Sequence, residues 1–289
     1  MSINKWLEKN TCGLVGKKVA ISGSTGGLGR ELCVYLCSLG AELILVDRNI
    51  EKSKKLADEL RSQYPMAKIT HVNADTSEIT SVKAAADELL SMEIDYLILN
   101  AGAYSIPRHT CDTGYDNVFQ INFISPYYLA KRLLPKIRER GGRVIAVGSI
   151  AHNYSKIDEG DIDFSTRSQS SLVYGNAKRY LTYSLMALSC GDVVIAHPGI
   201  SFTGITNHYP RLIFAIIKHP MKVIFMKPRK AALSILYGIF AECNGESWIG
   251  PWLFDVWGMP SVKRLNTADQ KEKSRIIAIA EDIYYKLDR

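Results

Sequence analysis

Apolar residues along the chain alternate between short continuous runs and longer helical repeats. Residues 17–22 form an apolar run of strand length, which ends in a glycine-rich turn at 23–29. A second apolar run at 43–46 leads into Asp47. Between the two runs, leucines recur at helical spacing at Leu28, Leu32, Leu36 and Leu39. This pattern predicts a strand, a turn, a helix and a second strand in direct succession.

The same alternation continues as far as residue 199. Further strands are predicted at 69–74, 95–99, 143–147 and 193–196, and further helices at 51–63, 77–92, 114–140 and 170–189. Strands with continuous apolar runs, separated by helices, indicate a parallel sheet that is covered on both faces. We therefore predict an α/β fold with one doubly wound, mostly parallel sheet and helices on both faces.

The pattern changes after residue 199. Residues 200–228 are apolar, with basic residues and prolines between the apolar ones. The elements expected after them are a helix at 229–243, a strand at 248–256 and a terminal helix at 267–287. At the other end, residues 1–16 predict a short amphipathic helix around Trp6. No repeat or linker divides the chain, so we predict one domain over 1–289, with 261–289 as a C-terminal helical extension.

Composition narrows the function classes. The 289-residue chain carries a net charge of +7, from 36 basic and 29 acidic residues. This charge favours anionic ligands or surfaces, but it is too diffuse to indicate nucleic-acid binding. The six cysteines and six histidines lack metal-ligand spacing, so we expect no metal, reduced thiols and a cytoplasmic location. Residues 1–16 lack the apolar core of a signal peptide, and no run reaches the roughly 18 apolar residues of a membrane span.

The turn at 23–29 suits a phosphate-bearing ligand. Gly23, Gly27 and Gly29 have no Cβ, so backbone N–H groups can approach a pyrophosphate, and the following helix presents its positive end to it. Asp47 ends the next strand, where a carboxylate can accept the hydroxyls of an adenosine ribose. The alternative is an ordinary tight turn between a strand and a helix. The combination of strand, turn, helix and acid favours nucleotide binding.

Tyr174 and Lys178 have the spacing needed for proton transfer. The ordinary pKa of tyrosine, about 10, is too high for a base at neutral pH, and a lysine four residues later on a helix shares its face and can lower it. The same spacing occurs at Tyr64/Lys68 and at Tyr127/Lys131. However, Tyr64 precedes Pro65, which disfavours a helix there, and the Tyr127 pair is more simply an amphipathic surface pair.

Ser149 follows the apolar strand at 143–147. Its hydroxyl can therefore lie at the carboxyl edge of the sheet, where open α/β folds bind ligands. At that edge it could donate a hydrogen bond to a substrate oxygen as negative charge develops. The alternative for a serine at a strand end is a turn residue.

These landmarks together resemble the short-chain dehydrogenase/reductase family, whose members have a Rossmann fold. The shared landmarks, in order, are Gly23/Gly27/Gly29, Asn100-Ala101-Gly102, Asn122, Ser149, Tyr174/Lys178 and Pro198-Gly199. The resemblance covers about residues 16–260. One departure is Gly148, which stands where a second serine is common in the family.

The resemblance implies a role for each matching residue. Tyr174 would be the general acid/base, Lys178 would lower its pKa and bind the nicotinamide ribose, Ser149 would orient the substrate oxygen, and Asn122 would hold a proton-relay water. The implied cofactor contacts are Gly23, Ser24, Thr25, Gly27, Leu28, Gly29, Asp47, Arg48, Asp75, Thr76, Asn100, Ala101, Gly102, Tyr174, Lys178, Pro198, Gly199, Ile200 and Thr203. Family members usually pair through two long helices, here at 114–140 and 170–189, which implies a homodimer or homotetramer.

Cofactor choice depends on Asp47 and Arg48. A carboxylate at the strand end repels a 2′-phosphate and favours NAD, whereas an arginine just after it could bind that phosphate. The turn at 23–29 contains no basic residue, so we predict NAD, with NADP as the alternative.

Residues 200–228 occupy the position of the family's substrate lid, and their apolar content predicts a bulky lipophilic substrate. Alternatives are a core or subunit contact, or a peripheral membrane contact through 211–227. The sequences HPGISFTGIT, WIGPW and WGMP resemble the branch of retinol and hydroxysteroid dehydrogenases. We predict an oxidoreductase acting on a hydroxysteroid-like secondary alcohol or its ketone. The alternatives are a reductase of 3-oxoacyl thioesters, retinoids or sugars, and a non-catalytic NAD(P)-sensing protein.

Overall fold

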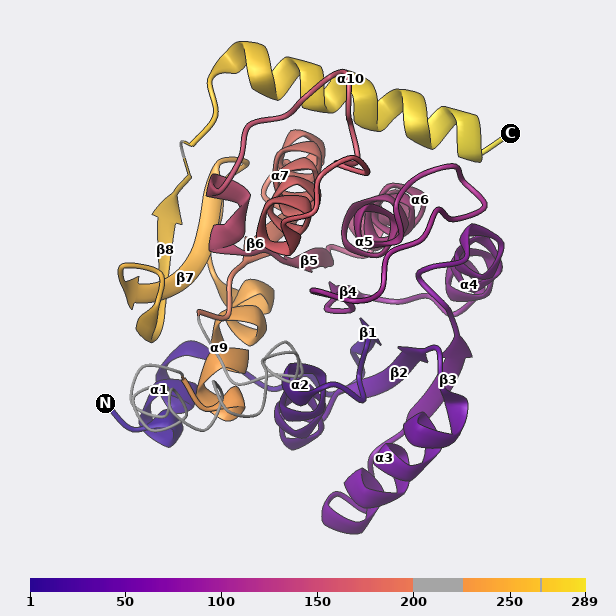
Figure 1. Cartoon of the computed structure of the whole chain (residues 1–289). Helices are drawn as coiled ribbons and strands as arrows, with labels where there is room; N and C mark the ends of the chain where they lie inside the picture. The colour runs from indigo at the N-terminus through magenta and orange to yellow at the C-terminus, as the bar shows by residue number, and fades with distance from the viewer. Residues whose placement is uncertain (200–225, 266) are drawn as a thin grey trace, which may run out of the picture.

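The sheet that runs through the molecule has eight strands in the order β3-β2-β1-β4-β5-β6-β7-β8 (Figure 1). The computed structural model describes residues 1–199, 226–265 and 267–289. The strands are β1 Lys18–Ser22, β2 Glu42–Asp47, β3 Ile69–Asn73, β4 Tyr96–Leu99, β5 Arg143–Val147, β6 Val193–Ala196, β7 Ser247–Leu253 and β8 Trp257–Arg264. Pairing is parallel from β3 through to β7, and β8 is antiparallel to β7.

Helices cover both faces of this sheet. They are α1 Ile3–Asn10, α2 Gly27–Ser38, α3 Ile50–Gln63, α4 Ile79–Ser91, α5 Asn117–Phe119, the π-helical turn η1 Gln120–Ile124, α6 Ser125–Glu139, the 3-10 turn η2 Ile150–Asn153, α7 Ser170–Leu188, α9 Pro228–Phe240 and α10 Gln270–Leu287. One core lies between the sheet and α4, α6 and α7, and a second lies between the opposite face and α2, α3 and α9. The predicted doubly wound α/β fold is confirmed.

The helix predicted at 114–140 is interrupted. The chain is α-helical at α5, widens to the π-helical turn η1 and becomes α-helical again in α6. Asp116 caps the start of α5, where its side chain accepts a hydrogen bond from the Val118 N–H. Asn122 lies inside the π-helical turn. Such turns often occur at functional sites, because the extra residue redirects side chains.

One strand was predicted at 248–256, but the structure has a hairpin of two strands there, β7 and β8. The C-terminal extension predicted as helical at 261–289 therefore begins inside β8. β7 ends at Leu253, and Phe254 and Asp255 then take left-handed backbone angles, with φ of 51° and 58°. These angles reverse the chain into β8. Neither turn position is a glycine, so no local glycine pattern marked the reversal.

The C-terminal helix α10 lies across α7 and α6 (Figure 1). It buries Ile276, Ala280, Ile283 and Tyr284 against them. The Tyr127 hydroxyl donates to Glu281 at 2.7 Å, and Lys131 pairs with the same carboxylate. Tyr127 is therefore a buried anchor for α10 and not part of a surface pair, which corrects the prediction. The helices α6 and α7, which were predicted to pair two copies of the chain, are covered by α10 on the face that it contacts.

The segment 200–225 lies outside the described residues. The predicted cofactor contacts Ile200 and Thr203, most of the predicted lid at 200–228 and most of the predicted membrane contact at 211–227 fall there. Across the part of the chain that the structure describes, no helix is both long and apolar enough to span a membrane.

Candidate active site

The carboxyl ends of the parallel strands form the edge where the candidate residues gather. Strand order reverses between β1 and β4, because β1 is followed on one side by β2 and β3 and on the other by β4 and β5. The loops after β1 and β4 leave the sheet in opposite directions at such a switch point, so a ligand crevice opens between them. Gly23 follows β1, Asn100 follows β4, and Ser149 follows β5 closely.

The glycine turn has the shape of a phosphate cradle. Gly23 has a φ of +67°, and a Cβ placed on it would lie 2.9 Å from the Ala101 Cα. A Cβ on Gly29 would lie 2.2 Å from the Gly23 carbonyl oxygen, so only glycine allows α2 to begin this close to the turn. Gly26 caps α2 without a side-chain hydrogen bond, which leaves the first N–H groups of the helix available to an anion.

Asn100 holds the turn against the end of β4. Its side-chain amide donates to the carbonyl oxygens of Ser22 at 3.1 Å and Gly23 at 2.9 Å. The backbone N–H groups of Asn100 and Ala101 donate to the Ser22 hydroxyl, each at 3.1 Å. The buried Asn100 Oδ1 has no protein partner among the described residues, so it is an acceptor available to a ligand. The bracing role of Ser22 was not predicted, although its position at a strand end was a usable signal.

Asp47 and Arg48 have different settings at the end of β2. Asp47 is buried, and its carboxylate accepts hydrogen bonds from the Ser24 hydroxyl and the Thr25 N–H. Its carboxylate therefore braces the glycine turn. The Arg48 side chain is 74% exposed and lies 3.6 Å from Asp75, which follows β3. Arg48 is thus the accessible charged group at this strand end.

Asn122 is placed by the π-helical turn against the loop after β4. Its side-chain amide donates to the carbonyl oxygens of Ala103 and Val118, both at 2.8 Å, and its Oδ1 accepts from the Ala103 N–H at 3.2 Å. A Cβ on Gly102 would lie 2.9 Å from Asn122 Oδ1 and 3.8 Å from Lys178 Nζ. Because Gly102 has no side chain, the side chains of Asn122 and Lys178 can both lie close to its Cα.

Tyr174 and Lys178 project from α7 toward the end of β5. Lys178 Nζ lies 5.7 Å from the centre of the Tyr174 ring and donates to the Val147 carbonyl oxygen at 2.8 Å. The Ser149 side chain lowers the pKa of Tyr174, as a hydroxyl donor near the phenol oxygen does. The structure thus brings together Ser149, Tyr174, Lys178 and, across Gly102, Asn122. The two other tyrosine–lysine pairs with this spacing lie elsewhere. Tyr64 is the non-helical residue that ends α3, and Tyr127 contacts Glu281 of α10.

Burial sets the protonation of this pair. It raises the pKa of Tyr174 to about 12, an effect larger than the lowering by Ser149. It also lowers the pKa of Lys178 to about 7. Burial removes water from both charged forms, so it favours the neutral phenol and the neutral amine. Tyr174 therefore carries its proton at neutral pH, while Lys178 titrates there.

The departure at Gly148 has a packing reason. A Cβ on Gly148 would lie 2.7 Å from Ile195 Cγ2 and 3.0 Å from Trp248 Cζ3. Ile195 and the indole of Trp248 together fill the space that the side chain of a second serine would occupy. Gly199 is similarly enclosed, because its Cβ would lie 2.6 Å from Met226 Cε and 2.8 Å from the Val256 carbonyl oxygen.

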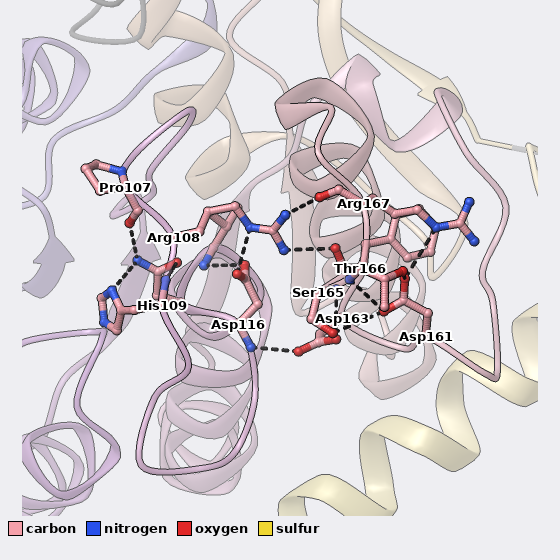
Figure 2. A network of polar contacts seen from close by, with 12 residues as sticks. Pro107, Arg108, His109, Asp116, Asp161, Asp163, Ser165, Thr166 and Arg167 are labelled. Carbon is pink, nitrogen blue, oxygen red and sulfur yellow. Dashed lines mark hydrogen bonds and ion pairs between the residues drawn. The ribbon is translucent and has the colours of Figure 1, made fainter.

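A polar network joins the loop around Arg108 and Asp116 to the loop at 161–167 (Figure 2). Arg108 donates to Asp116 at 2.8 Å and to the Phe164 carbonyl oxygen at 2.8 Å, and the Asp116 N–H donates to Asp163 at 2.7 Å. The loop that carries Arg108 also carries Tyr104, whose ring meets Tyr174 edge-on at 5.3 Å. This network therefore holds the loop that places Tyr104 against Tyr174. The network was not predicted from the sequence.

The fold and these residues define a nucleotide-binding α/β protein whose tyrosine, serine and lysine lie together at the carboxyl edge of the sheet. The family described as short chain dehydrogenase matches residues 17–159. Retinol dehydrogenase 12 of Mus musculus is 29% identical over 286 residues, covering 93% of this chain and 89% of that protein. The chain belongs to the short-chain dehydrogenase/reductase family, with relatives in its retinol dehydrogenase branch.

Solved structures agree with the fold. A protein titled as putative and uncharacterized from Mycobacterium Paratuberculosis aligns over 96% of each chain, with a TM-score of 0.75 and 21% identity. The Pseudomonas aeruginosa RhlG/NADP active-site complex aligns over 81% of this chain and 94% of that one, with a TM-score of 0.61 and 24% identity.

Proposed function

We propose that the protein is an NAD(P)-dependent oxidoreductase that transfers a hydride between the cofactor and a bulky lipophilic alcohol or its carbonyl form. The observation that carries the proposal is the approach of Asn122 and Lys178 across Gly102, beside Tyr174 and Ser149. These groups lie at the same edge of the sheet as the glycine turn, in which Gly23 and Gly29 leave no room for a Cβ. That turn, the uncapped start of α2 and the free Asn100 Oδ1 all fit a dinucleotide.

Each group has a role that follows from its contacts. The bound cofactor would supply or accept the hydride. Tyr174 would donate its proton to the substrate oxygen during reduction and take it back during oxidation. The Ser149 Oγ accepts the Ala151 N–H at 3.2 Å, and its own proton, which lowers the pKa of Tyr174, could be donated to a substrate oxygen that lies beside both hydroxyls. Lys178 would hold the nicotinamide ribose beside Tyr174, and Asn122 would order a water for proton exchange.

The relatives support a lipophilic substrate. Two relatives from Mus musculus are named retinol dehydrogenase 12 and polyprenol dehydrogenase, and both names refer to lipophilic alcohols. Our proposed substrate is a hydroxysteroid-like alcohol. Retinoids are the strongest alternative substrate class, because relatives include retinol dehydrogenases.

A substrate panel tests the proposal. The purified protein is incubated with hydroxysteroids, retinol and short-chain 3-oxoacyl thioesters, and NADH and NADPH are followed separately. We expect turnover with at least one lipophilic alcohol and little with the thioesters. Turnover of the thioesters alone would discard the lipophilic substrate, and absence of turnover throughout would favour a cofactor-sensing protein.

Arg48 should decide how well the protein uses NADPH. Arg48 is exposed at the end of β2, whereas the Asp47 carboxylate accepts a hydrogen bond from Ser24 in the glycine turn. An Arg48→Ala variant should raise the KM for NADPH by about tenfold, because an arginine pairs strongly with a phosphate. The KM for NADH should stay within about twofold. Lys52→Ala, on the exposed side of α3, is the control for a general loss of positive charge, and an equal effect of both variants would contradict the assignment.

A further inference from the structure

His152 lies directly behind Ser149 and is almost fully buried, with 1% of its surface exposed. It belongs to the 3-10 turn η2, which follows β5. Its Nδ1 lies 2.6 Å from the Ser149 carbonyl oxygen, and its Nε2 lies 2.9 Å from the Thr267 hydroxyl, just before α10. The imidazole thus connects the candidate catalytic serine to Thr267, which is 115 positions after His152 in the chain.

The partners fix the tautomer of this histidine. A carbonyl oxygen can only accept, so Nδ1 must carry the proton that points at Ser149. Burial lowers the pKa of His152, which favours the neutral ring, so Nε2 is an acceptor. The Thr267 hydroxyl then donates to Nε2 and accepts in turn from the Tyr183 hydroxyl on α7. Every polar hydrogen along this chain of contacts has an acceptor.

The surroundings hold the imidazole on its other sides. Trp248 of β7 packs against it with ring centres 5.2 Å apart. Arg179 donates to the His152 carbonyl oxygen at 2.9 Å and forms a buried, two-pronged ion pair with Glu272, at 2.7 and 2.6 Å. Arg179 follows Lys178 directly on α7. The support behind Ser149 is therefore tied to the helix that carries the tyrosine and the lysine.

We propose that His152 is a positioning residue for the reaction: through Nδ1–H it holds the backbone of Ser149 so that the serine hydroxyl faces Tyr174. The proposal rests on the proposed oxidoreductase function. A hydroxyl held by a short turn moves when its backbone carbonyl loses a donor, and small displacements of an orienting group reduce turnover strongly. The segment at 267–272 would then contribute to the rate as well as to stability.

Two variants of nearly equal shape separate this role from packing. In His152→Asn the side-chain amide can occupy the position of Nδ1 and still donate to Ser149, whereas His152→Leu has no donor. Both lose the Thr267 contact and most of the packing against Trp248. We expect kcat within about threefold of the parent for the asparagine variant and at least about tenfold lower for the leucine variant. Melting temperatures should fall similarly in both, and cofactor dissociation constants should stay unchanged.

A second readout does not need a substrate. In protein labelled with 15N in its histidines, the His152 signals are assigned by their loss in His152→Asn. We expect neutral imidazole with the proton on Nδ1. Equal kcat values for the asparagine and leucine variants, or a proton on Nε2, would overturn the proposal. If the parent protein turns over nothing in the panel, the proposed function fails, and the tautomer alone then decides whether His152 holds Ser149.

Discussion

Replacing Tyr174 with phenylalanine should lower kcat by about 10²–10⁴-fold, while NAD(P) binding changes by less than about twofold. Burial of the phenol raises its pKa to about 12, so Tyr174 holds its proton until the substrate oxygen accepts it. Phenylalanine keeps the ring and its edge-on contact with Tyr104. The loss should therefore fall on proton transfer, measured as kcat, with cofactor binding followed by fluorescence titration.

Tyr127→Phe is the matched control, since Tyr127 also precedes a lysine by four residues on a helix. It should leave kcat unchanged and lower the melting temperature slightly, because the hydrogen bond to Glu281 is lost. If Tyr174→Phe retained full turnover, or if both variants lost it equally, the proton would come from another group.

Lys178→Met should give a protein that is more stable at pH 7 and nearly inactive. Burial lowers the pKa of Lys178 to about 7, so folding removes a proton that the unfolded chain would hold up to about 10.5. This cost is of order 3–4 kcal/mol at pH 7. Methionine avoids it but loses the hydrogen bond to Val147, which leaves a net gain of about 2–3 kcal/mol. We expect turnover to fall by at least about 10²-fold, because the ribose and Tyr174 lose their partner.

The pH dependence of stability checks this assignment. Between pH 7 and 10.5 the unfolded lysine binds a proton that the folded one does not, so this group makes the parent more stable as pH rises. The advantage of Lys178→Met in chemical unfolding should therefore shrink by about 1.4 kcal/mol for each pH unit above 7.5. Lys131→Met removes an ion pair with Glu281 and should destabilise instead. A constant difference between parent and Lys178→Met would show that the lysine is charged when folded.

The sequence predicted those features that depend on short-range pattern. The strands, the glycine turn and the tyrosine with its lysine all lie within segments whose hydrophobic period and spacing were visible. The candidate residues could be placed together because residues that follow parallel strands meet at one sheet edge. Even the departure at Gly148 was visible, although its cause, the close approach of Ile195 and Trp248 from other strands, was not.

Features that depend on long-range contacts were missed. The partner of His152 is Thr267, and the partner of Arg108 is in the loop at 158–167, so no local pattern marked either residue. The π-helical turn at Asn122 has an ordinary helical sequence, and the loop after β4 supplies the acceptors that stabilise its bend. The sequence also predicted a lysine that lowers the tyrosine pKa, whereas in the structure the lowering comes from Ser149 and burial outweighs it.

The position of α10 has a consequence for biosynthesis. Thr267 and Glu272, which contact His152 and Arg179, come after α7 and after β8 in the chain, so the ribosome adds them later than those elements. Domains tend to fold from the N-terminus during translation, so the sheet and α7 can form before their brace exists. The Tyr128 hydroxyl also donates to Asp288 at 3.0 Å, so α6 gains this contact later still. A nascent chain that ends before residue 267 would therefore hold its glycine turn in place but lack the contacts that support Ser149 through His152.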